Sequence, residues 1–314
     1  MNKNIEFLDR LKLILNEEID FNFTEKLAKY SLKDVVNILK KYEENEPDKK
    51  RKKLIDLLNK GKEDGSITDD KIEVSEFYIK VKNLQPTQSE IDLLKSIGVI
   101  LTPKAREKDI NVKEFLTYIL MDGKAKQFFK NKILIANGKY IIDGHHRWSQ
   151  VFILNPDAEI PVINFDFKTQ KITDILKYFQ IVIFATFKNI AIKTTNENTN
   201  VFELSEKELN ALLDEILDDM TQDALEVFKE FFAIENKNDL KDEIFLYLKQ
   251  NISLFKNIYK NKISKLPPRN LMPQPTNSAK KQGIKEKDAL DMLKRKLSSG
   301  EIDLSKPFFK KENK

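Results

Sequence analysis

The sequence predicts an α+β fold, with a small mixed sheet at its centre and helical extensions at both ends. Two observations predict it. Short apolar, β-forming runs gather between about residues 72 and 167. The segments before and after this part repeat apolar residues at spacings of three and four, which is typical of amphipathic helices. At 314 residues, the chain has room for one compact domain with extensions or for two domains.

Four consecutive regions are expected along the chain. Residues 1–65 form a helical N-terminal region, residues 72–167 the mixed domain, residues 172–260 a helical C-terminal domain, and residues 261–314 a basic, proline-containing tail. In the first region Pro47 and the charge run 48–53 interrupt the pattern. Its helical repeats are Leu8, Leu11 and Leu15, then Leu32, Val35, Val36 and Leu39, then Leu54, Leu57 and Leu58.

The mixed domain contains a predicted hairpin. Apolar runs at 133–136 and 140–142 flank Asn137-Gly138, a dipeptide that favours tight two-residue turns. Before the hairpin, the alternation of Phe77, Ile79 and Val81 predicts a strand. A helix is expected over 112–129. A further strand is predicted over 159–167.

Three amphipathic helices are predicted in the C-terminal domain, and the tail differs from them in charge. The helices are marked by Leu209, Leu212, Leu213, Ile216 and Leu217, by Phe228, Phe231 and Phe232, and by Ile244, Phe245, Leu248, Ile252 and Phe255. Between residues 256 and 296 there are 12 Lys or Arg against 3 acidic residues, although the whole chain is only +5. The segment that contains Pro267, Pro268, Pro273 and Pro275 is expected to be extended or loop-like. Such a basic arm would bind nucleic-acid phosphates or an acidic neighbouring subunit. Its candidate contacts are Lys280, Lys281, Lys294, Arg295 and Lys296.

The most informative motif is the hexapeptide Asp143-Gly144-His145-His146-Arg147-Trp148, which holds both histidines of the chain. It lies between the hairpin and a predicted helix. A glycine there lets the backbone approach a ligand, and the N–H groups that open a helix attract anions. Arg147 adds a guanidinium that is suited to phosphate. The motif therefore predicts a phosphate site made by Gly144, His145, His146 and Arg147.

This block resembles the ParB/sulfiredoxin superfamily, and most closely the ParB-like domain proteins of bacteriophages. The resemblance also rests on Leu101-Thr102-Pro103 and on the box Leu84-Gln85-Pro86-Thr87-Gln88, and it covers about residues 72–167. A weaker similarity extends to Pro-Pro-Arg-Asn-Leu-Met-Pro-Gln, from Pro267. The resemblance implies a nucleotide, ATP, ADP or CTP, bound with Mg²⁺ that arrives with it.

The same resemblance implies site residues. In free-serine kinases, whose loop also reads Asp-Gly-His-His-Arg, a glutamate acts as base, and Glu90 is the nearest candidate here. Thr87, Gln88 and Asp143 would line the pocket. His145 or His146 would stabilise transferred charge. The chain departs from its relatives in two ways: it has no cysteine, which excludes sulfiredoxin chemistry, and histidines replace two positions of the Gly-Glu-Arg-Arg box of partition proteins.

Several of these residues also have structural interpretations. Asp143 would cap the following helix as readily as it would hold Mg²⁺, and Thr87 or Ser89 would cap a helix beginning near Glu90. Adjacent helical residues point about 100° apart, so one histidine is expected to face the anion and the other to bond the fold. Arg147 would pair with Asp143 or Glu159. Trp148, Val151 and Phe152 are expected on the buried side of the helix, and no protein-made metal site is predicted.

Two functional hypotheses follow. The first is a phage-type ParB-like protein that binds a nucleotide at 143–147, either as a phosphotransferase or ATPase or as a DNase associated with DNA. The second is a non-catalytic virion or packaging-associated protein that keeps the fold and binds other phage structural proteins. The longest apolar stretch, 175–187, contains Lys177 and Gln180 and is too short for a bilayer. Without a signal-peptide pattern, the protein is expected in the host cytoplasm or the virion, and its oligomeric state is left open.

Overall fold

The computed structural model describes residues 30–62, 70–108, 110–125, 132–194 and 199–303. They form two compact units. Unit 1 takes its residues from 1–74, 167–192 and 273–314, and unit 2 from 75–166 and 193–272. This grouping differs from the four consecutive regions expected from sequence, because the segment 167–192 belongs with both ends of the chain. Leu8, Leu11 and Leu15 lie outside the described residues.

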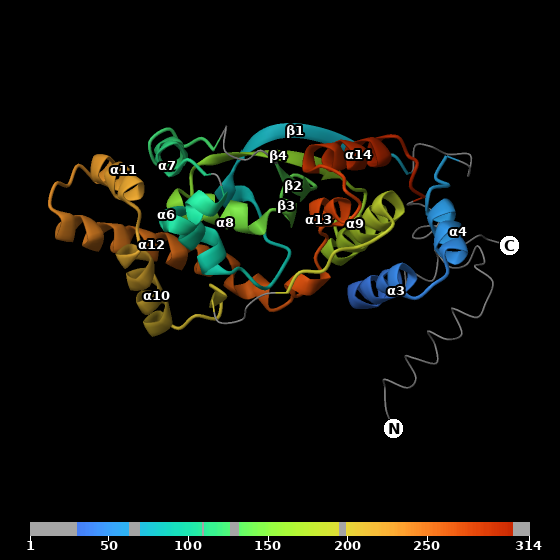
Figure 1. Ribbon diagram of the computed structural model, residues 1–314, viewed down its shortest axis with the longest axis horizontal. Coiled ribbons are helices and arrows are strands. Elements are labelled where there is room, and N and C mark those ends of the chain that lie inside the picture. Colours follow the sequence, from blue (N-terminus) through green and yellow to red (C-terminus); the bar gives the residue numbers. More distant parts are fainter. Residues whose placement is uncertain (1–29, 63–69, 109, 126–131, 195–198, 304–314) are drawn as a thin grey trace, which may run out of the picture. The chain divides into compact units, whose positions relative to one another are not determined.

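Unit 2 contains most of a four-stranded mixed sheet of order β1-β4-β2-β3, which confirms the predicted α+β class (Figure 1). The strands are β1 (Glu73–Lys80), β2 (Ile133–Ala136), β3 (Tyr140–Asp143) and β4 (Glu159–Asp166). β2 pairs antiparallel with β3 and parallel with β4. The register shifts between Leu134 and Ile135, so that Leu134 faces Asp143 and Ile135 faces Ile141. The irregularity therefore lies at the end of β3, directly before the hexapeptide.

The predicted hairpin is confirmed, and its turn has the expected backbone. Asn137 and Gly138 both have positive φ, 50° and 70°, and the N–H of Lys139 donates to the carbonyl of Ala136 at 3.1 Å, as in a type I′ turn. Because Ala136 pairs with Tyr140, the loop holds three residues, 137–139. β1 and β4 are also found near the expected strands, although Val81 begins a short 3₁₀ turn instead of continuing β1. The helix expected over 112–129 is α7 (Val112–Leu120), and it ends before Gly123, which has a φ of 62°.

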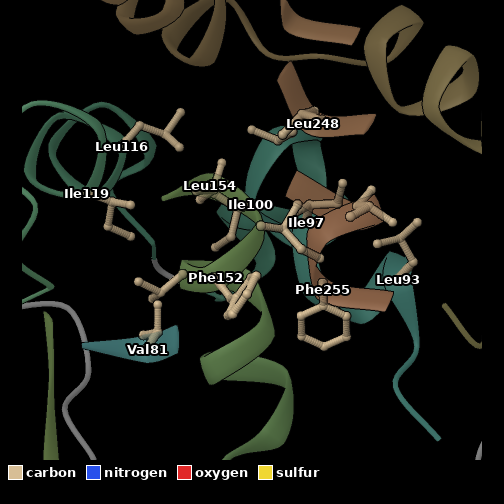
Figure 2. Packing of buried hydrophobic residues seen from close by; sticks show 14 of the residues in the cluster. Val81, Leu93, Ile97, Ile100, Leu116, Ile119, Phe152, Leu154, Leu248 and Phe255 are labelled. Carbon is tan, nitrogen blue, oxygen red and sulfur yellow. The ribbon is translucent and has the colours of Figure 1, made fainter. Parts of the chain in front are cut away.

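The helices of unit 2 enclose one hydrophobic core. They are η2 (Leu94–Gly98), which is a π-helical turn, α6 (Val99–Leu101), α7, α8 (His145–Leu154), α10 (Glu206–Asp218), α11 (Gln222–Phe232) and α12 (Lys237–Ile263). The three helices predicted after residue 205 are confirmed. α12 packs against α8, α10 and α11, and Figure 2 shows its Leu248 and Phe255 in the core with Phe152 of α8.

Trp148 is the largest side chain of this core, and it is fully buried, as expected for the inner side of α8. Its ring centroid lies 4.9 Å from that of Phe255 and 5.4 Å from that of Tyr259. Its indole N–H donates to the carbonyl of Val81 at 2.8 Å. The hydroxyl of Tyr259 in turn donates to the carbonyl of Leu84 at 2.7 Å. The core therefore holds the start of the segment that leads to the candidate site.

Unit 1 is helical around one central helix. α9 (Ile172–Phe187) contacts α3 (Leu32–Glu44), α4 (Asp48–Leu58), α13 (Pro275–Lys280) and α14 (Glu286–Ser298). Nearly every side chain of α9 is buried, which explains its long apolar run. The buried ammonium of Lys177 pairs with Asp174 at 2.8 Å. Among the described helices none is long and apolar enough to cross a bilayer.

The proline segment 267–274 is irregular apart from the 3₁₀ turn η5 (Arg269–Leu271), as expected. The basic tail as a whole is not an arm, however, because the residues that follow form α13 and α14. Pro275 occupies the first turn of α13, where a proline lacks no needed N–H. Leu290, Leu293 and Leu297 of α14 are buried at helical spacing. The charge run 48–53 was also expected to interrupt the helical pattern, and this expectation is wrong. Pro47 separates two helices, but the run itself lies within α4.

Three of the five predicted nucleic-acid contacts in the tail have carboxylate partners. Lys281 pairs with Glu43 at 3.1 Å and Lys294 with Asp291 at 2.7 Å, and Lys296 pairs with Glu301. Lys280 and Arg295 lie on the surface of α13 and α14. Nucleic-acid binding by these residues stays a prediction, without the arm that suggested it.

Candidate functional site

The hexapeptide forms the turn between β3 and α8, and Gly144 is the residue that makes the turn. Its φ is 100°, a left-handed conformation that other residues rarely adopt. A Cβ at this position would lie 3.0 Å from Cγ1 of Ile133 and 3.1 Å from Nη2 of Arg147. The turn therefore needs glycine for its conformation and for the close approach of its neighbours.

The first turn of α8 opens with free backbone donors. Gly144 is the N-cap, and no side chain caps the helix, so the expected cap by Asp143 is not formed. Within the described part of the chain, no acceptor is found for the N–H groups of His145 and His146. Such N–H groups, at the positive end of the helix dipole, favour a negative charge in front of them.

The segment Leu84–Asp92 crosses this end of α8. It begins beside β3, where the N–H of Gln85 donates to the carbonyl of Lys139 at 2.7 Å and the N–H of Ile141 donates to the carbonyl of Gln85 at 2.9 Å. The amide of Asn200 holds its later part, because Oδ1 accepts from the N–H of Ile91 at 3.0 Å and Nδ2 donates to Ser89 at 3.3 Å. The segment is thus fixed at both ends.

Both histidines bind this segment. Nε2 of His145 accepts the N–H of Thr87 at 3.1 Å, and Nε2 of His146 accepts the N–H of Asp92 at 3.3 Å. One ring was expected to face the anion and the other to form a hydrogen bond within the protein. Instead, Nε2 of both rings forms a hydrogen bond with the protein backbone. Each Nε2 accepts a hydrogen bond, so each neutral ring carries its own hydrogen on Nδ1.

The histidine rings are uncharged at neutral pH. Burial lowers the pKa of His145 well below its usual value, with smaller effects from His146 and Arg269. For His146, burial and then Arg269 lower the pKa to about 3. Positive charge at the site therefore comes from arginine and lysine. The catalytic role of the histidines stays a prediction, and only Nδ1–H is left for it.

The pocket residues expected from sequence are close together, but their polar groups bind the protein itself. The hydroxyl of Thr87 donates to the carbonyl of Ile141, and Nε2 of Gln88 donates to the carbonyl of Glu90. Oε2 of Glu90 accepts the backbone N–H of Arg269 at 3.3 Å. Thr87 and Gln88 are buried, while Glu90 is half-buried. Glu90 as a base stays a prediction.

The helix cap expected from Thr87 or Ser89 is not formed, and Asp92 takes this place. The helical run begins at Leu93, and the carboxylate of Asp92 accepts the N–H of Lys95 at 3.1 Å, in the manner of a helix cap. Asp92 also accepts the hydroxyl of Thr199 at 2.7 Å and pairs with the ammonium of Lys95 at 3.1 Å. Burial raises its pKa, and these partners outweigh that effect, so the carboxyl group has a pKa below its usual value.

Arg269 is the residue that sequence reasoning missed. Its side chain is only 8% exposed, and its buried Nη1 has no hydrogen-bond partner among the described residues. Its charge acts on both histidines and on Asp92, Glu90 and Asp143, so the guanidinium lies within electrostatic reach of the start of α8. Burial lowers its pKa, and the three carboxylates oppose this. Arg269 is the third residue of the Pro-Pro-Arg-Asn-Leu-Met-Pro-Gln string that begins at Pro267. The weak similarity of this string to phage proteins was the signal that could have drawn attention to Arg269.

Arg147 lies on the exposed side of the same turn. Its Nη2 lies 3.8 Å from Oδ2 of Asp143, and both side chains are partly exposed, which agrees with the predicted pairing to Asp143. Among the described residues, no three His, Asp or Glu side chains form a group that could hold a metal ion. Mg²⁺ is commonly held by one or two carboxylates together with waters and phosphate oxygens, so Asp143 as a ligand of nucleotide-bound Mg²⁺ stays a prediction.

Comparison with known proteins adds little to this geometry. No family model matches the chain, and no curated protein matches it. A solved structure of a Pnob8-like ParB-N domain is 12% identical, with 62% of this chain and 84% of that chain covered and a TM-score of 0.21. A likeness this distant does not establish a shared fold. The α+β class rests on the sheet and helices themselves, and membership in the ParB/sulfiredoxin superfamily stays a prediction.

Proposed function

We propose that unit 2 binds a phosphorylated ligand, a nucleotide with its Mg²⁺, at the turn Asp143–Arg147. The observation that carries this proposal is the buried guanidinium of Arg269, whose Nη1 has no hydrogen-bond partner among the residues that the structure describes. Burying an arginine donor without an acceptor is costly. A ligand oxygen in front of Gly144 would accept this donor and remove that cost.

The surrounding groups support a phosphate in particular. The open N–H groups of His145 and His146 suit tetrahedral anions, and Arg147 adds a second guanidinium. The neutral histidines add no charge but keep the Leu84–Asp92 segment in place. The ParB-like resemblance noted in the sequence, which implies ATP, ADP or CTP, supports a nucleotide as the phosphate carrier.

The proposal concerns binding and leaves out a reaction step. Glu90 accepts the backbone N–H of Arg269, and both histidine Nε2 atoms accept backbone N–H groups. A general base needs a free acceptor near the attacking group. The groups around the turn are arranged to hold an anion. Transfer or hydrolysis of a phosphate group would need a nucleophile supplied by a second substrate or by water.

Replacing Arg269 with methionine is expected to weaken binding of Mg²⁺–ADP by at least about thirtyfold, because removal of a buried charged partner costs about 2 kcal/mol or more. The measurement is isothermal titration calorimetry of the full chain with ADP, ATP, CTP and inorganic pyrophosphate. Arg269→Met is preferred to Gly144→Ala, since alanine at a φ of 100° strains the fold itself.

Arg295→Met is the matched control, because Arg295 lies exposed on α14. It should bind each ligand like the unaltered chain. Equal affinity of Arg269→Met and the unaltered chain would refute the role of Arg269. Absence of binding by all four ligands would refute the proposal and favour the non-catalytic virion or packaging-associated protein.

A further inference from the structure

A cavity lies in unit 2, outside the turn described above. Its volume is about 370 Å³, within the range of small-molecule sites. The last turns of α12 form one wall with Lys256, Lys260 and Ile263. Phe202 and Glu203, which precede α10, also line the cavity, as does Ser89.

Two ammonium groups face this cavity without a carboxylate partner. Lys256 and Lys260 are one helical turn apart on α12, and within the described residues no ion pair is formed by either. Nζ of Lys256 donates to the carbonyl of Leu204 at 2.6 Å, which fixes the ammonium at the wall. Burial, and then the charge of Lys260, lower the pKa of Lys256. Like charges one turn apart repel, and an anion between them would remove the repulsion.

Phe202 gives the cavity a flat, apolar surface next to the charged residue Glu203. The ring of Phe202 stacks on Phe255 with centroids 5.3 Å apart and planes 19° apart. Phe255 is fully buried in the core, so Phe202 is held in a fixed orientation. A flat apolar group can stack on such a ring, and Ile263 adds apolar surface beside it.

We propose that this cavity binds a small organic anion in which a carboxylate is attached to a flat aromatic body. The carboxylate pairs with Lys256 and Lys260, and the aromatic body lies against Phe202. The site does not depend on the phosphate site at Gly144, because none of its charged groups belongs to that turn.

The test uses 2-naphthoate and the uncharged 2-naphthamide as probes in titration calorimetry of the full chain. The acid is expected to bind and the amide to bind about tenfold more weakly or not at all, as loss of one charge pair predicts. Lys260→Met should weaken binding of the acid about tenfold. Lys262→Met is the matched control on the same helix, since Lys262 is exposed and lies outside the cavity.

Lys260→Met is preferred to Lys256→Met, whose lost hydrogen bond to Leu204 could alter the fold. Phe202→Leu should also weaken binding of the acid, with Mg²⁺–ADP affinity unchanged in both variants. Failure of the acid to bind, equal binding of acid and amide, or equal loss in Lys260→Met and Lys262→Met would each overturn the proposal.

Discussion

Lowering the pH from 7.5 to 5 is expected to destabilise the protein, by up to about 2 kcal/mol for His146, and His145 adds to this loss in the same direction. Both have a pKa below the ordinary value of 6.5 in the folded protein. Below that value the unfolded chain takes up protons that the folded chain does not, so stability falls as the pH falls. For His146 the loss continues to the folded pKa of about 3.

Chemical denaturation at a series of pH values measures this effect. The chain has only two histidines, and carboxylates titrate mainly below pH 5, so the window from 7.5 to 5 isolates them. The double variant with His145→Gln and His146→Gln is the control, because a glutamine oxygen accepts the same N–H groups without titrating. A flat stability profile in the unaltered chain would contradict the neutral, hydrogen-bonded histidines.

Replacing Trp148 with alanine is expected to lower the free energy of unfolding by about 3–5 kcal/mol. The fully buried indole would leave a cavity beside Phe255 and Tyr259, and the carbonyl of Val81 would lose its donor. Denaturant unfolding of the purified chain measures the change.

Trp148→Phe separates packing from hydrogen bonding. It keeps an aromatic ring in the core and removes the N–H, so its loss should be clearly smaller than that of the alanine variant. A loss below about 1 kcal/mol for Trp148→Ala, as for surface substitutions, would show that α8 and α12 do not share this core.

The elements that could be predicted from sequence are those encoded locally. Asn137-Gly138 between two β-forming runs specified the hairpin, and the apolar spacing on each side of Phe228 and Phe255 specified α11 and α12. The buried side of α8 followed from the spacing of Trp148, Val151 and Phe152 in the same way. These signals span a few residues and need no partner.

Two of the missed features, the buried Arg269 and the second histidine bond, depend on residues far apart in sequence. Arg269 lies more than a hundred positions from α8 in the sequence, and the two prolines before it draw attention to the segment without showing that its guanidinium is buried. The helix α14 has a local signal in Leu290, Leu293 and Leu297, but the many lysines of that segment favoured a solvated arm. The second histidine bond was missed because the path of Leu84–Asp92 across α8 is set by Asn200 and β3.

A crystal structure of the full chain with inorganic pyrophosphate tests the central claim most directly. We expect an anion in front of Gly144, with oxygens within hydrogen-bond distance of the N–H groups of His145 and His146 and of Nη1 of Arg269. An empty position at saturating pyrophosphate, with Nη1 of Arg269 bonded to an acceptor of the protein, would contradict phosphate binding at this turn.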